Sequence, residues 1–128
     1  MRRLLLFTAL LALAAVPAAA AKEPVRATVC GASGCKTSTD RTRLARVPWG
    51  GSDVPAAPRP APYYRIRLKI DFGATVKLIW VPSRSVFYRE LEGNAPGWSS
   101  VVQGKNALAW LVRGVRPFPA PKTWATVL

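Results

Sequence analysis

Histidine is absent from this 128-residue chain, and acidic residues number only six. The first absence removes the side chain that most often moves protons near neutral pH and most often binds transition metals. The glycine motifs that bind phosphates or dinucleotides are also absent, as are the serine motifs of common hydrolases. The sequence therefore predicts a protein that is not an enzyme and that binds no metal and no cofactor.

The few carboxylates include one pair with a catalytic spacing. On one face of a strand, Glu90 and Glu92 would lie near the separation of about 5 to 9 Å that paired glycosidase carboxylates use. Gly93 begins a turn directly afterwards, and the alternative is a pair of solvent-facing charges near a strand end. A small hydrolase using Glu90 and Glu92 is the third of three functional hypotheses.

Long apolar runs are missing except near the N-terminus. There, two arginines precede an apolar stretch over residues 4–16, and the alanines at 18–21 offer the small residues that signal peptidase recognises. This pattern predicts a secretory signal peptide over residues 1–21. The alternative, an uncleaved anchor, is disfavoured because the apolar stretch is shorter than the ~20 residues that span a bilayer.

The rest of the chain, residues 22–128, is long enough for one small extracytoplasmic domain. No later segment is long and apolar enough to span a membrane. We therefore expect a secreted or extracytoplasmic protein with no transmembrane segment after signal cleavage.

Cysteine is scarce too, but Cys30 and Cys35 are close together. In an oxidising compartment such a pair favours an intramolecular disulfide. Residues 27–29 and 36–39 are rich in β-branched side chains and residues 31–34 are typical of a turn, so a disulfide-closed β-hairpin is predicted. The alternative, a redox or metal site, is disfavoured because the spacing is not C-x-x-C and two thiolates make a poor zinc site.

Positive charge is what the chain has in excess. Lys and Arg number 19 and the formal net charge is +13, which falls to +11 when Arg2 and Arg3 are removed with the signal. Such a field favours encounter with anionic partners, among them cell-envelope polymers, polysaccharides, lipid headgroups and nucleic acid. The alternative is a solvated basic surface without a ligand.

The abundance of Arg, Ala, Val and Pro favours a GC-rich coding sequence and hence a bacterial source.

Twelve prolines are present, many of them in two segments of the mature chain. Residues 47–62 predict an irregular connection, because proline and glycine resist helix and sheet interiors. Within it, residues 57–62 favour a polyproline conformation, either as a stiff spacer or as an exposed recognition strip. Residues 117–121 predict an extended tail over the domain surface.

The clearest secondary-structure signal is the alternation of apolar and polar or charged residues over 63–72, repeated over 75–81. With Gly73 between them, these segments predict an antiparallel hairpin. Its even positions face one core: Tyr64, Ile66, Leu68, Ile70 and Phe72 with Val76, Leu78 and Trp80. A register centred on Gly73 pairs Ile70 with Val76, Leu68 with Leu78, and Ile66 with Trp80. A third strand is predicted over residues 85–91.

Residues 98–113 allow two interpretations. Ser100 and Gln103 have capping-box spacing, and apolar residues follow near helical spacing, which favours a helix over residues 101–113. Gly104 and Asn106 weaken that helix, so two strands are the alternative. With the helix, the predicted fold is a small α+β domain with the disulfide-closed hairpin, an antiparallel sheet of three to five strands and one C-terminal helix.

The odd positions of the predicted hairpin form the candidate anion-binding surface, which we call the basic face: Arg65, Arg67, Lys69 and Lys77. The predicted register places Lys77 opposite Lys69, and like charges directly opposite destabilise a sheet. That cost is explained if the face receives an anion, with Tyr63 available to stack on a sugar or base ring. The alternative is that long cations only keep one sheet face solvated and discourage aggregation.

The leading hypothesis is an exported, basic, monomeric binding protein that contacts an anionic polymer of the cell envelope, a polysaccharide or nucleic acid. The second is a secreted inhibitor or protein-interaction module, for which small size, a disulfide and five tryptophans are suitable. Only Trp49 and Trp124 lie in segments that we expect to be exposed.

Overall fold

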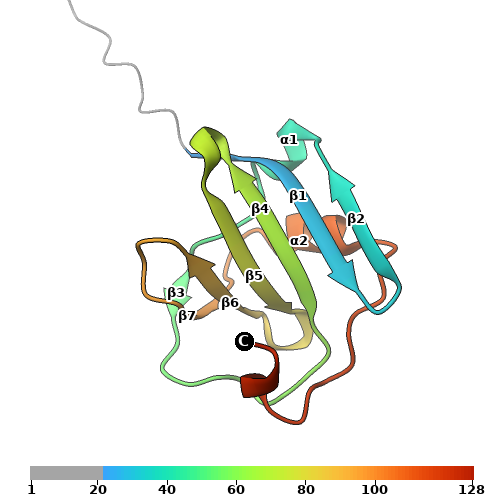
Figure 1. The fold of residues 1–128 in the computed structure, drawn as a ribbon, viewed down its shortest axis with the longest axis vertical. Coiled ribbons are helices and arrows are strands. Elements are labelled where there is room, and N and C mark those ends of the chain that lie inside the picture. The colour runs from blue at the N-terminus through green and yellow to red at the C-terminus, as the bar shows by residue number, and fades with distance from the viewer. Residues whose placement is uncertain (1–21) are drawn as a thin grey trace, which may run out of the picture.

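A seven-stranded antiparallel sheet forms the centre of the structure, a computed structural model that describes residues 22–128 (Figure 1). The signal peptide predicted over residues 1–21 and the side chain of Phe72 lie outside this description. The strands follow the spatial order β2-β1-β4-β5-β6-β7-β3. Their bounds are β1 Pro24–Gly31, β2 Gly34–Ser38, β3 Ser52–Asp53, β4 Tyr64–Ile70, β5 Thr75–Val81, β6 Val86–Leu91 and β7 Gly97–Ser100.

The antiparallel hairpin predicted from the alternation is confirmed, and it consists of β4 and β5. Burial along β4 alternates at every residue, with the even positions buried. The register differs from the predicted one by two positions, since Leu68 pairs with Val76 and Ile66 with Leu78. The reason is the short turn η1 (Asp71–Gly73), where the backbone N–H of Ile70 donates to the carbonyl of Ala74 at 2.8 Å. A shift of two residues keeps the side chains of β4 and β5 on their predicted faces.

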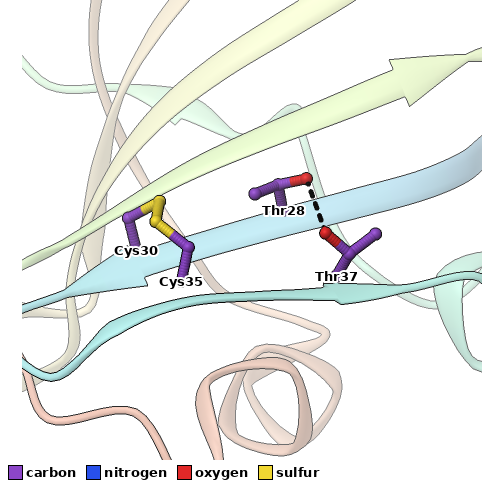
Figure 2. Close-up of a disulfide and its surroundings, with 4 residues drawn as sticks. All are labelled: Thr28, Cys30, Cys35 and Thr37. Carbon is purple, nitrogen blue, oxygen red and sulfur yellow. Dashed lines mark hydrogen bonds between the residues drawn. A yellow bond between two sulfur atoms is a disulfide. The ribbon is translucent and has the colours of Figure 1, made fainter.

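The disulfide-closed hairpin is confirmed. Cys30 and Cys35 are register partners on β1 and β2, are joined by a disulfide, and have Cα atoms 4.0 Å apart. Two positions along, the hydroxyls of Thr28 and Thr37 lie 3.2 Å apart on the same face of the hairpin (Figure 2). A covalent link and a side-chain hydrogen bond therefore join the two outermost strands at this edge.

The sheet has more strands than the three to five predicted. One of the unexpected strands, β3, lies inside the proline-rich connection, where Ser52 pairs with Ser100 and Asp53 with Ser99 of β7. The pairing joins residues far apart in the sequence. The local composition, rich in proline and glycine, therefore gave no indication of it.

Both interpretations of residues 98–113 are partly correct. Residues 97–100 form β7, and the predicted helix is present but begins later, as α2 (Lys105–Val112). Because Ser100 pairs in the sheet, the predicted capping box does not form, and Gly104 with a φ of 87° precedes the helix instead. A Cβ at Gly104 would also lie 2.8 Å from the ring of Pro48. Glycine is required there for both reasons.

Helix α2 and the short helix α1 (Arg41–Leu44) lie on the same side of the sheet, which we call the core-side face. In Figure 1, α2 lies behind β1. The phenol of Tyr64 donates a 2.9 Å hydrogen bond to the carbonyl of Val115 just beyond α2, and burial raises its pKa. The main core of fully buried side chains includes Leu44, Ile66, Leu68, Ile70, Val76, Leu78, Phe87, Leu108 and Leu111.

A second, smaller core lies around the C-terminal turn η3 (Trp124–Thr126) and the two proline-rich segments. Tyr63 and Phe118 exchange two backbone hydrogen bonds of 3.2 and 2.8 Å, and the indole of Trp124 donates to the carbonyl of Pro58 at 2.8 Å. Trp124 is only 6% exposed, and Trp49 packs half-buried against the main core. The expectation that these two tryptophans are exposed is therefore wrong, because the proline-rich segments fold back onto the domain.

Candidate anion-binding face

The basic face lies on the side of the sheet opposite α1 and α2. Arg65, Arg67 and Lys69 occupy the exposed positions of β4, and Lys77 is exposed on β5. Alternate residues of a strand are roughly 7 Å apart, so the three β4 cations span about 14 Å. The structure brings all four cations onto one continuous surface.

Two of these cations lie directly across the ladder from each other. The register pairs Lys77 with Arg67, where the sequence had predicted Lys69. Within residues 22–128, the only carboxylate–cation pairs closer than 4.0 Å are Arg41 with Asp71 and Arg43 with Asp40. Among the described residues, no carboxylate lies within 4.0 Å of either cation of this like-charge pair, although Glu90 is the register partner of Lys77 on β6. Like charges directly opposite each other disfavour the sheet.

A fifth cation, Arg26, extends the basic face. It is exposed on β1 and is the register partner of Lys69. Sequence reasoning missed it because β1 and β4 are separated by the whole proline-rich connection. The burial of Ala27 and Val29 agrees with an outward Arg26, but no local pattern places it beside Lys69.

Arg65 differs from the other cations because the protein itself holds it. Its guanidinium donates a 2.9 Å hydrogen bond to the carbonyl of Val127 and lies 6.0 Å from the ring centre of Tyr63. Tyr63 is 8% exposed, and its ring also packs 5.2 Å from Phe118 and 5.7 Å from Trp124. The structure thus places Tyr63 beneath Arg65, within the second core.

The surface around these cations is hollowed. Two adjoining hollows of about 290 and 230 Å³ share Arg65, Arg67, Lys77 and Ile79 in their linings. The first extends to the disulfide side of the sheet, and the second extends to the end of the described chain. Their further lining residues include Thr28 and Cys30 in the first, and Tyr88, Glu90, Val127 and Leu128 in the second. The basic face is therefore a shallow groove around Arg65, Arg67 and Lys77, and Lys69 and Arg26 lie outside its lining.

The two glutamates of the hydrolase hypothesis line a third, wider hollow of about 680 Å³, which shares Lys77 and Glu90 with the second. Glu90 is exposed on β6 as the register partner of Lys77, and Glu92 follows the end of that strand. Among residues 22–128, no group of three or more Cys, Asp or Glu side chains is arranged to hold a metal ion. The same residues include no helix long and apolar enough to cross a membrane.

No protein-family model, no curated protein and no solved structure matches this chain.

Proposed function

We propose that this protein is an exported, non-enzymatic binding protein that holds an anionic polymer on the basic face. The observation that carries the proposal is the exposed like-charge pair of Arg67 and Lys77, next to a second pair of neighbouring cations, Arg26 and Lys69. A bound anion would offset the repulsion within both pairs. The signal-like N-terminal sequence and the disulfide support export.

A polymer fits this surface better than a small anion because the cations are spread over several strands. Each cation that neutralises a polymer charge releases a counterion, so affinity falls steeply as salt concentration rises. Arg65 is already oriented by Val127 and loses little freedom on binding. The other cations are free to follow the polymer.

The test compares two triple variants with the same loss of charge. R67Q/K69Q/K77Q removes basic-face cations and leaves Arg65 and its bond to Val127 in place. R59Q/R84Q/K122Q removes three exposed cations from other parts of the surface. Retention on an anionic resin, on nucleic acid and on isolated cell envelope is measured at several salt concentrations.

We expect the basic-face variant to elute at clearly lower salt than the wild type, and the control variant to elute close to it. Equal losses in the two variants would show that net charge alone governs retention. Unchanged retention of the basic-face variant would also end the proposal.

The other two hypotheses stay predictions. The tryptophans expected to anchor a protein-interaction module, Trp49 and Trp124, are packed against the domain. A pull-down with secreted proteins that survives high salt would favour that module over polymer binding.

A further inference from the structure

The groove of the basic face is not lined by cations alone. Glu90 lines it beside Arg67 and Lys77 and is the register partner of Lys77. A carboxylate in this position repels any nearby anionic group of a polymer, and it gains nothing in return from a polymer without hydrogen-bond donors. The same carboxylate accepts hydrogen bonds from hydroxyl groups. A ligand that carries hydroxyls between its anionic groups therefore fits this lining better than a uniformly charged one.

The groove also has apolar parts. Ile79, 7% exposed, lies in both hollows, and Leu128, 47% exposed, lies at the edge of one. Sugar rings combine apolar C–H faces with polar edges, and binding sites commonly set a few oriented polar groups in an apolar lining. Leu128 can contact such a ring while the neighbouring cations hold its acidic group, and the small exposed part of Ile79 adds to the apolar lining.

Aromatic rings near the groove are engaged with one another. Tyr63, Trp98 and Trp124 are buried in the second core, and the half-buried Tyr88 packs edge-on against Trp98 at 5.3 Å. Proteins that bind single-stranded nucleic acid present aromatic rings on which successive bases stack. The aromatic residues that the structure describes at this face are used for packing instead.

From these linings we infer that the polymer is an acidic polysaccharide lying along β4. Its carboxylate or sulfate groups contact Arg67, Lys77 and the Arg26–Lys69 pair, and its hydroxyls donate to Glu90. The inference rests on the proposed function and narrows the ligand from polyanions in general to a chain that mixes acidic groups with hydroxyls.

The test uses three probes matched in number of anionic groups: oligogalacturonate, linear polyphosphate and oligothymidylate. Affinities are measured by calorimetry for the wild type, for E90Q and for the control E23Q. Glu23 is exposed outside the groove, so both variants lose one negative charge. Circular dichroism confirms that each variant is folded.

We expect the wild type to bind oligogalacturonate most tightly. E90Q should improve polyphosphate and oligothymidylate binding by about two- to fivefold, because it removes one nearby like charge. It should improve oligogalacturonate binding less, because the charged acceptor for the sugar hydroxyls is replaced by the weaker, neutral amide oxygen of glutamine. E23Q should leave the order and the ratios of the three affinities unchanged.

Two results would overturn the inference while leaving the proposed function intact. One is equal improvement of all three probes in E90Q. The other is that the wild type binds polyphosphate or oligothymidylate more tightly than oligogalacturonate, and that this binding is lost in R67Q/K69Q/K77Q. If the tightest probe is oligothymidylate, the ligand is a nucleic acid. If none of the probes depends on those three cations, the proposed function itself fails.

Discussion

The same strands are buried to different extents on the two faces of the sheet. On the core-side face, Leu68, Val76 and Leu78 are all buried beneath the helices. On the opposite face, burial changes within β5, where Lys77 is exposed but Ile79 is buried next to the C-terminal segment. The basic face therefore occupies the part of this surface that no other segment of residues 22–128 covers.

This difference shows that the pattern of apolar residues in a strand reflects how many of its faces are covered. Strand β4 alternates throughout and is covered on one face only. Strand β5 begins with the same alternation and then becomes continuously apolar over residues 78–81. An unbroken apolar run is typical of a strand covered on both faces. The transition in β5 marks where the second core begins.

The largest expected effect is a difference in the free energy of unfolding between variants at two neighbouring residues of β4 that point to opposite faces. Leu68→Ala should lower the free energy of unfolding by about 3 kcal/mol, because a fully buried side chain leaves a cavity. Lys69→Ala, the matched control, should change it by less than about 0.5 kcal/mol. Guanidinium unfolding measures both. Similar losses at the two positions would contradict the assignment of the faces.

A smaller effect is expected at the edge of the sheet. Replacing Cys30 and Cys35 by serine should cost about 2 kcal/mol on the chain-entropy estimate for so short a loop. Thr28→Val with Thr37→Val keeps the disulfide and removes only an exposed hydrogen bond, so it should cost much less. Denaturant unfolding with and without reductant compares them. A serine variant as stable as the oxidised wild type would show that the disulfide does not stabilise the fold.

The smallest effect concerns the hydrogen bond from Tyr64 to Val115. Tyr64→Phe should cost about 1 kcal/mol at neutral pH. Burial raises the pKa of Tyr64 above its ordinary value of 10.0, so the unfolded chain ionises first as pH rises. The wild type should therefore lose stability above about pH 10 through this group, and Tyr64→Phe should lack that part of the loss. Unfolding free energies at neutral and alkaline pH test this, and parallel pH profiles would refute it.

Local patterns predicted those parts of the fold that depend on neighbours in sequence. The alternation in residues 63–72 predicted β4, and the spacing of Cys30 and Cys35 predicted the hairpin. The register was wrong by two positions because pattern alone does not fix where a turn is centred. The helix α2 was predicted, but its start was set by the pairing of Ser100 in the sheet.

The rest depended on contacts between distant segments. Arg26 joins the basic face through the pairing of β1 with β4, and β3 forms only against β7. The burial of Ile79 had a local signal in the continuous apolar run of β5. The burial of Trp124 had none, because it follows from packing against Tyr63 and Trp98, which are distant in the sequence.

The contacts that hold the C-terminal segment also constrain how the chain folds. The indole of Trp124 bonds to a carbonyl 66 residues earlier, and the backbone of Arg116 bonds to the side chain of Ser33, 83 residues earlier. Pairings of such long range must wait for large loops to close, and domains dominated by them fold in milliseconds to seconds. We expect the β4–β5 hairpin to form early and the docking of the C-terminal segment to be among the last steps. Until then, the apolar end of β5 remains exposed to solvent and prone to association with other chains.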